Sequence, residues 1–328
     1  KRMLAEKFSI TGKPKVTLLG IGMGSEDTLT VEGKRAVEQA DLIVGARRMA
    51  DAVKLPEQDV FYEYRSEEIA DYIRKHPEYS RIVIALSGDV GFYSGAKKLL
   101  ELLGPETEIL CGISSVVYFM AKIGLSWDDA CIVSAHGRDC SLLPLIRTNR
   151  KVFAILGTKD KVAEIAGRLH AYGMEDVLLY VGENLSYKNE KIFVKKPAEL
   201  LDYQGDALSV LCAYNEKAVP PPATHGFPDE AFIRGKAPMT KTEVRTVSLG
   251  KLRLTEDAVC YDVGAGTGSV SIEMALRAFK GKVYAIEKKE EAASLLEENR
   301  KKFAADNLTV IRGTAPEAMK DLPAPTHA

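Results

Sequence analysis

Three glycines at alternate positions separate a predicted buried strand from a predicted helix toward the C-terminal end of the chain. The strand is the apolar run Val259–Val263, and the turn after it reads Gly264-Ala-Gly266-Thr-Gly268. Glycine adopts backbone conformations that other residues avoid and lets the main chain approach a ligand closely. Because the chain then enters the positive end of a helix, the segment predicts an α/β domain with a ligand at the carboxyl end of this strand.

The spacing of these glycines favours one class of ligand over another. A dinucleotide-binding turn has the pattern G-x-G-x-x-G, whereas this turn is G-x-G-x-G with an acid, Asp262, two residues before Gly264. The tighter turn leaves little room for a pyrophosphate, which argues against a nicotinamide oxidoreductase, and it suits the amino-acid half of S-adenosylmethionine (AdoMet). A second predicted strand ends at Glu287, 23 residues after Gly264, where a carboxylate can hydrogen-bond both ribose hydroxyls.

Composition excludes several other classes of protein. The 328 residues, 46% of them hydrophobic, suffice for two or three domains with buried cores, and a net charge of −1 favours neither nucleic acid nor a membrane surface. We find no apolar run of about 18 residues, so no membrane segment is expected. Five cysteines, an odd number, indicate reduced thiols and a cytoplasmic protein. Cys131, His136 and Cys140 match no familiar zinc spacing, so no metal is expected.

The clearest domain boundary is the run Val219-Pro-Pro-Pro222, because three prolines continue neither a helix nor a central strand. We expect a domain over residues 14–218, with lobes of about 14–111 and 112–218, then a linker over 219–225 and a second domain from 226 to 328. In the first domain, strands alternate with helices, which predicts parallel sheets buried on both faces. The expected strands cover residues 15–19, 41–44, 81–86, 108–110, 152–156, 177–181 and 208–212.

The second domain carries three predicted strands, over residues 259–263, 283–287 and 308–311, with helices between them and a short helix near 316–322. The helix over 290–303 places Ala292, Leu295, Leu296, Asn299 and Phe303 on one face, and all but Asn299 are apolar. A doubly wound sheet needs more strands than these, so we expect the domain to be incomplete. A fourth strand, which would flank the first, would begin only near His327, so we expect the first strand to expose a row of unpaired backbone N–H and C=O groups.

The chain carries a series of motifs that begin at Gly20, Leu86, Gly112, Val133, Val181, Asp229, Pro238 and Asp262. Their order resembles a known fusion of two methylase domains. Residues 14–217 resemble the tetrapyrrole methylases of the cobalamin pathway, and residues 226–328 resemble a partner methylase that also decarboxylates. Together they are similar to the family of decarboxylating precorrin-6Y C5,15-methyltransferases. Three departures are Met23 and Val90, where the family often has proline, and Thr314, where it usually has an acid.

The resemblance implies a two-lobed tetrapyrrole methylase fold followed by a Rossmann-like methyltransferase domain, AdoMet as cofactor, a precorrin as substrate and a homo-oligomer. It implies methylation at carbons 5 and 15 with loss of a carboxyl group. The cofactor-binding residues it implies in the first domain are Gly88, Asp89, Val90, Ser114 and Ser115. In the second domain they are Thr240, Asp262, Gly264, Ala265, Gly266, Thr267, Gly268, Glu287, Gly313 and Thr314.

Two residues in the first domain are candidates for catalysis. His136 is a candidate base, because the pKa of histidine lies near working pH, and Arg138 beside it is a candidate ligand for a substrate carboxylate. A precorrin bears many carboxylates, and cations gather over residues 132–159 and at Arg47 and Arg48. The alternatives are a structural histidine at a strand end and ordinary solvated charges.

Several alternatives stay open at this point. The acceptor is a precorrin, another tetrapyrrole or a different small molecule, and the C-terminal segment is either catalytic or a module that only binds AdoMet or docks the first domain. Thr240 either covers the cofactor together with Lys241 or caps the helix that holds Arg245. The serines at 114 and 115 either bind cofactor or only cap a helix.

Overall fold

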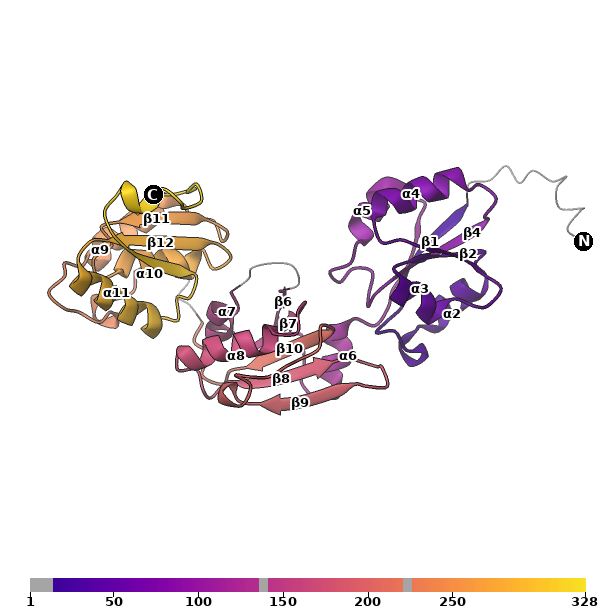
Figure 1. The fold of residues 1–328 in the computed structure, drawn as a ribbon, viewed down its shortest axis with the longest axis horizontal. Helices are drawn as coiled ribbons and strands as arrows, with labels where there is room; N and C mark the ends of the chain where they lie inside the picture. Colours follow the sequence, from indigo (N-terminus) through magenta and orange to yellow (C-terminus); the bar gives the residue numbers. More distant parts are fainter. Residues whose placement is uncertain (1–13, 136–140, 221–225) are drawn as a thin grey trace, which may run out of the picture. The chain divides into compact units, whose positions relative to one another are not determined.

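The computed structural model describes residues 14–135, 141–220 and 226–328, and the chain divides into two compact units. Unit 1 combines the described residues up to Trp127 with Gly182–Lys191, and unit 2 combines Asp128–Val181 with Ile192–Ala328. Figure 1 shows the course of the chain through its helices and strands. In the described part of the chain, every helix is too short or too polar to cross a bilayer.

Unit 1 contains a five-stranded sheet in the order β3-β2-β4-β1-β5, with all four neighbouring pairs parallel. The strands are β1 (Lys15–Gly20), β2 (Leu42–Gly45), β3 (Asp59–Tyr62), β4 (Arg81–Leu86) and β5 (Glu108–Leu110). The helices are η1 (Glu26–Thr28), α2 (Val31–Glu38), α3 (Arg47–Val53), α4 (Ser66–Lys75), α5 (Ala96–Leu103) and α6 (Ser115–Lys122). Thr30 caps α2 by accepting a hydrogen bond from the backbone N–H of Gly33.

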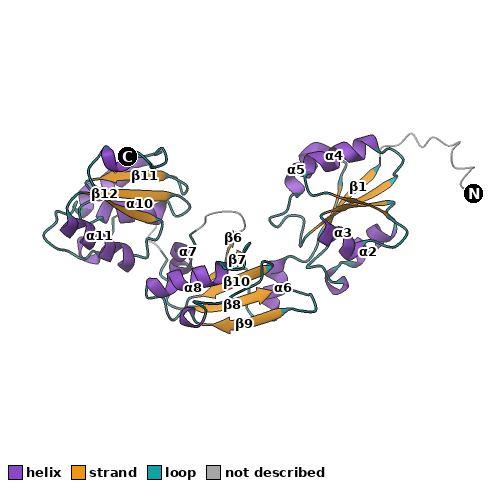
Figure 2. Cartoon of the chain, in the orientation of Figure 1, coloured by secondary structure: helices purple, strands orange, loops and turns teal. Residues whose placement is uncertain are grey.

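Both faces of this sheet are buried, as the apolar strands predict. Figure 2 shows α4 and α5 on one face and α2 and α3 on the other. Because successive side chains of a strand point to opposite faces, Ile84 packs in one cluster with Ile69 of α4, whereas Val83 packs in a second cluster with Met49 of α3. The predicted parallel sheet is therefore confirmed in unit 1.

The second sheet has the order β6-β7-β10-β8-β9, and here the prediction of parallel strands is partly wrong. β6 and β7 are parallel, but β7 and β10 are antiparallel. A parallel neighbour requires a crossover connection, usually a helix, and residues 184–208, all described, contain no α-helix. The elements are β6 (Cys131–Ser134), α7 (Leu143–Thr148), β7 (Lys151–Ile155), α8 (Lys161–Ala171), β8 (Leu178–Glu183), β9 (Lys191–Lys195), η2 (Pro197–Glu199) and β10 (Ser209–Tyr214).

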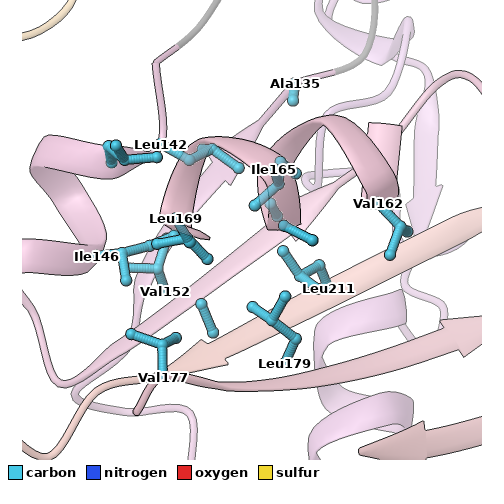
Figure 3. Close-up of a cluster of buried hydrophobic side chains, with 14 of the residues drawn as sticks. Ala135, Leu142, Ile146, Val152, Val162, Ile165, Leu169, Val177, Leu179 and Leu211 are labelled. Carbon is cyan, nitrogen blue, oxygen red and sulfur yellow. The ribbon is translucent and has the colours of Figure 1, made fainter. Parts of the chain in front are cut away.

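A single apolar cluster holds α8 against this sheet, as Figure 3 shows. Val162, Ile165 and Leu169 recur at helical spacing along one side of α8, and each is at most 3% exposed. They share the cluster with buried strand residues such as Leu179 and Leu211. The helix is therefore fixed by burial of this face.

The third sheet consists of three parallel strands in the order β11-β12-β13. Its predicted strands agree with the structure to within one residue, and the short helix expected near 316–322 is a single 3₁₀ turn. The elements are η3 (Asp229–Ala231), α9 (Thr242–Leu252), β11 (Val259–Val263), α10 (Ser269–Arg277), β12 (Lys282–Glu287), α11 (Glu290–Lys302), β13 (Leu308–Arg312) and η4 (Glu317–Met319).

The chain continues from η4 back to the free side of β11. The backbone N–H of Thr326 donates to Val259 O at 2.8 Å, and the N–H of Tyr261 donates to His327 O at 2.9 Å. Cys260 and His327 form a parallel bridge. Among the described residues the sheet has no fourth strand, but the expectation that the free edge of β11 is left unpaired is wrong in part, because Thr326 and His327 bond to Val259 and Tyr261.

Asn299 is the single polar residue on the predicted inner face of α11, and it is fully buried. Its Oδ1 accepts a hydrogen bond from Ile233 N at 2.7 Å, while its Nδ2 donates to Ile233 O at 3.0 Å and to Thr267 O at 3.1 Å. A buried amide is stable when its donors and acceptor are satisfied in this way. Asn299 thereby joins α11 to the glycine turn and to the segment before α9.

Candidate functional site

A cavity of about 820 Å³ lies at the carboxyl ends of β11, β12 and β13. Open parallel sheets bind ligands at this edge, so the position is the one that the glycine turn predicts. Five short segments form its walls, over residues 236–240, 263–266, 286–289, 291–292 and 313–315. We call it the C-terminal cavity.

The three glycines of the turn have different structural roles, although all three have positive φ angles, of 79°, 57° and 78°. A Cβ on Gly264 would meet no described atom within 4 Å, so its backbone faces open space in the cavity. A Cβ on Gly266 would lie 2.9 Å from Pro238 O, and one on Gly268 would lie 2.5 Å from Leu296 Cγ. Gly268 therefore lets α11 approach the turn and does not line the cavity.

Glu287 lies at the end of β12, lines the cavity and is 7% exposed. Its Oε2 accepts a hydrogen bond from Gly266 N and its Oε1 accepts one from Lys289 N, each at 2.9 Å. Burial acts to raise the pKa of this carboxyl, but the backbone hydrogen bonds from Lys289, Gly266 and Lys288 outweigh it, and the pKa lies below its ordinary value. The cavity thus contains an ionised carboxylate with unused acceptor lone pairs, which suits a diol.

Asp262, near the end of β11, and Thr267, in the glycine turn, both lie outside the lining of the cavity. Asp262 Oδ2 accepts a hydrogen bond from Ser271 Oγ at 2.5 Å, and burial raises the pKa of Asp262. Thr267 is 1% exposed, and its carbonyl accepts from Asn299. Both residues hold the turn against α10 and α11, and a direct contact of either side chain with a cofactor stays a prediction.

Replacing Asp262 with asparagine should raise the free energy of unfolding at neutral pH. Because the pKa of Asp262 is raised in the folded state, its ionised form costs stability above that pKa, and the cost disappears as the pH falls through it. The asparagine oxygen can still accept from Ser271. Denaturant unfolding at neutral pH and below the ordinary aspartate value of 3.8 checks this, and a variant that is less stable than the wild type at neutral pH would contradict it.

Thr240, Gly313 and Thr314 line the cavity, as predicted for residues near a cofactor. The alternative that Thr240 caps α9 is wrong, because the N-cap of α9 is Lys241. The Lys241 ammonium lies 3.3 Å from Asp229 Oδ2 and does not line the cavity. A covering role is thus open to Thr240 but not to the side chain of Lys241 in this arrangement.

Sequence reasoning missed other lining residues, among them Lys236, Met239, Lys288 and Lys289. The two lysines after Glu287 directly follow the end of a predicted strand, which is the signal that could have found them. Lys236 and Met239 precede α9 and come to the cavity only through tertiary contacts. The three lysines are exposed and bring positive charge to the cavity mouth.

Unit 1 brings together the three glycine turns that follow β1, β4 and β5. A Cβ on Gly20 would lie 2.7 Å from both Gly112 N and Gly88 O, so the three backbones touch directly. Gly22 and Gly88 exchange backbone hydrogen bonds of 3.1 Å and 2.8 Å. These three loops therefore meet at the carboxyl edge of one sheet.

The predicted cofactor residues of unit 1 lie at this edge of the sheet, but their side chains have different environments. Asp89 Oδ1 accepts from Gly112 N at 3.0 Å and its Oδ2 accepts from Gly91 N at 2.8 Å, so the side chain ties two turns together. Val90 belongs to the apolar core. Ser114 is the N-cap of α6 without a side-chain capping bond, and Ser115 begins the helix. Cofactor contacts of these residues stay predictions.

The candidate catalytic residues His136 and Arg138 lie outside the described residues, as does Cys140. Among the described residues no group of three His, Cys, Asp or Glu side chains is placed to hold a metal ion. The predicted basic patch over 132–159 is partly wrong, because Lys151 is 7% exposed and pairs with Asp129. Arg48 is engaged in unit 1, where its Nη1 donates to Tyr187 Oη at 2.8 Å.

Comparison with known proteins gives two family matches. Residues 15–201 match the tetrapyrrole (corrin/porphyrin) methylases, and residues 230–328 match a precorrin methyltransferase domain. A precorrin-6Y C(5,15)-methyltransferase (decarboxylating) of Sinorhizobium sp. is 26% identical over 320 residues, 95% of this chain and 77% of the relative. A probable cobalt-precorrin-7 C(5)-methyltransferase of Methanocaldococcus jannaschii is 31% identical over 61% of this chain and 97% of the relative.

The C-terminal part has more similar relatives over a shorter length. A probable cobalt-precorrin-6B C(15)-methyltransferase (decarboxylating) of Pyrobaculum calidifontis is 52% identical over 106 residues, 31% of this chain and 54% of the relative. The chain thus spans about half the length of the C(15) relatives that it matches. Among solved structures, a uroporphyrin-III C-methyltransferase of Thermus thermophilus complexed with S-adenosylhomocysteine has a TM-score of 0.50 at 19% identity, over 61% of this chain and 97% of that one. This last likeness concerns the fold alone.

Proposed function

Because the chain belongs to the tetrapyrrole (corrin/porphyrin) methylase family, we propose that it is an AdoMet-dependent C-methyltransferase that acts on a precorrin in cobalamin biosynthesis. We assign methylation at carbon 5 to residues 14–218, in line with the C(5) relative that matches them. We assign methylation at carbon 15 and the decarboxylation to the domain that begins at residue 226, in line with the precorrin methyltransferase match.

The observation that carries the proposal for the second domain is the C-terminal cavity. Its volume falls within the range of sites that enclose a small molecule. Gly264 leaves open space where a side chain would stand, and the ionised carboxylate of Glu287 offers two acceptor oxygens at the end of β12. These groups fit AdoMet, with the glycine turn beside the methionine part, Glu287 at the ribose and Gly313 and Thr314 near the adenine.

AdoMet supplies a methyl group activated by its sulfonium centre. The protein's part is then chiefly to orient the acceptor carbon in line with that group and to exclude water. The exposed Lys236, Lys288 and Lys289 at the cavity mouth are placed to attract the carboxylates of a tetrapyrrole. The negative Glu287, held by backbone N–H groups within the wall, faces the cofactor and not these carboxylates.

Incubation of the protein with AdoMet and purified precorrin intermediates tests the proposal. We expect a product whose mass shows added methyl groups, with loss of carbon dioxide where the second domain acts. A control lacking AdoMet should show neither change. Methyl addition only with a different acceptor would identify the alternative substrate class, and binding of NAD without AdoMet in calorimetric titrations would contradict the proposal.

We also propose the domain division expected from the sequence, with lobes of about 14–111 and 112–218, a linker over 219–225 and a second domain over 226–328. The homo-oligomeric state and the cytoplasmic location expected from the sequence also remain predictions. Sedimentation of the purified protein would decide the first of these. A single species at the monomer mass of 35.9 kDa would contradict it.

A further inference from the structure

Residues 226–241 form a segment that we call the strap. It contains one regular element, the three-residue turn η3, and otherwise runs without helix or strand. Its last part, residues 236–240, forms one wall of the C-terminal cavity. A segment of this kind has no ladder of backbone hydrogen bonds of its own, so side chains from neighbouring helices must fix its position.

Arg245, in the first turns of α9, is the side chain most involved in that task. It is 0% exposed, and its guanidinium lies 4.8 Å from the centroid of the Phe232 ring. Its Nη2 donates to Phe227 O and its Nη1 donates to Thr240 O, each at 2.5 Å. One planar group thus joins both ends of the strap, and the second end is a wall residue of the cavity.

The buried charge of Arg245 is balanced by two carboxylates. Its Nε donates to Glu273 Oε1 of α10 at 2.7 Å, and its Nη1 lies 3.4 Å from Asp229 Oδ1 of the strap. Glu273 also accepts from the backbone N–H groups of Gly226 and Phe227, at 2.9 Å and 3.1 Å. Arg245 is fully buried in this network and is not among the residues that line the cavity, so it does not itself bind substrate in this arrangement.

We infer that Arg245 is a positioning residue of the C-terminal cavity, which holds the strap at Thr240 so that residues 236–240 close over bound AdoMet. The inference rests on the proposed function. Pro238 O lies 2.9 Å from the Cβ position of Gly266, which shows how closely the strap covers the glycine turn. A displacement of the strap would therefore open the site without touching Glu287 or the glycines.

The geometry requires arginine and not merely a positive charge. The guanidinium presents five N–H donors in a rigid plane, whereas a lysine ammonium presents three donors from one point. A lysine at position 245 can pair with Glu273 but cannot also reach Phe227 O and Thr240 O. Arg245→Lys thus keeps the buried ion pair and frees the strap at Thr240, while Asn299 still holds it at Ile233.

The test compares Arg245→Lys with Arg253→Lys, an equal exchange at an exposed position after α9. Ultraviolet cross-linking of radiolabelled AdoMet to the full chain, followed by peptide mapping, reports the C-terminal cavity separately from unit 1. We expect Arg245→Lys to weaken AdoMet binding in the C-terminal cavity about tenfold or more, because small displacements of positioning groups cost this much. Labelling of unit 1 and all properties of Arg253→Lys should stay unchanged.

Limited trypsin digestion supplies a readout independent of AdoMet. The strap carries exposed cleavage sites at Arg234 and Lys236. We expect cleavage there to be several-fold faster in Arg245→Lys than in the wild type, at a temperature where both remain folded by circular dichroism. Equal cleavage and equal AdoMet affinity in the two proteins would overturn the inference.

A second variant covers the case in which Arg245→Lys fails to fold. Asp229→Asn keeps an oxygen that accepts from Thr242 Oγ1 and removes one charge facing Arg245 Nη1. We expect Asp229→Asn to weaken AdoMet labelling of the C-terminal cavity and to speed trypsin cleavage of the strap, each by a smaller factor than Arg245→Lys. If neither quantity changes, the inference is overturned. If the wild type binds no AdoMet, the proposed function fails, while strap cleavage still decides whether Arg245 positions the strap.

Discussion

Replacing Gly112 with alanine should destabilise unit 1 by about 3 kcal/mol, the upper end of the usual cost of overpacking. A Cβ at this position would overlap the carbonyl oxygens of Gly88 and Gly20, which are backbone atoms at the ends of β4 and β1. Gly88 exchanges two backbone hydrogen bonds with Gly22, and Gly20 pairs with Leu86 in the sheet, so withdrawal of either carbonyl would disturb that pairing. Equilibrium unfolding in denaturant, followed by circular dichroism, measures the loss.

Gly95→Ala is the matched control in the same unit. A Cβ on Gly95 would meet no described atom within 4 Å, and its φ is −74°, which alanine adopts readily. Its free energy of unfolding should stay within about 0.5 kcal/mol of the wild type, as is usual away from special sites. Equal stability of the Gly112→Ala and Gly95→Ala proteins would show that the three turns separate more easily than their geometry indicates.

Removing the Glu287 carboxylate should produce the largest loss of AdoMet binding in the C-terminal cavity. Each charge-assisted hydrogen bond to a ribose hydroxyl contributes about 1.5–3 kcal/mol, so Glu287→Ala should weaken binding by at least one order of magnitude. The variant also frees the backbone N–H groups of Gly266 and Lys289, which loosens the turn. Isothermal titration calorimetry with AdoMet measures the change.

Glu291→Ala is the appropriate control, because Glu291 also lines the cavity but is exposed at the start of α11. If the loss of any negative charge near the cavity changed AdoMet affinity, Glu287→Ala and Glu291→Ala would change it by a similar factor. If affinity is unchanged in Glu287→Ala, the assignment of this carboxylate to the ribose is wrong.

The central strands could be predicted from the sequence because they are buried on both faces, and the edge strands β5, β11 and β13 could be predicted because each is followed closely by a glycine turn. β4, for example, is a continuous apolar run, and its expected bounds agree with the structure. The missed strands, β3, β6 and β9, all lie at the edges of their sheets. An edge strand is partly exposed and carries polar residues, as in Lys191–Lys195, so it lacks the continuous apolar signal.

The candidate site, too, could be predicted only where its residues carry a local sequence signal. The glycine turn and Glu287 could be predicted because each follows a strand directly and their spacing has a physical meaning. The strap could not, since nothing local distinguishes Arg245, which is fully buried, from Lys241, which is exposed four residues earlier. Their different environments arise from Glu273, which is distant in sequence.

The strand order β6-β7-β10-β8-β9 has a consequence for how this sheet forms during synthesis on the ribosome. β10 is the last of these strands to be made, yet it fills the centre between β7 and β8. Until Tyr214 has been synthesised, both neighbours present unpaired backbone groups along one side. At about 5–20 residues per second this interval lasts for seconds, which is long enough for non-native pairing between nascent chains. Slow codons placed before β10 would lengthen the exposure, and chaperones that cover strand edges would act at this stage.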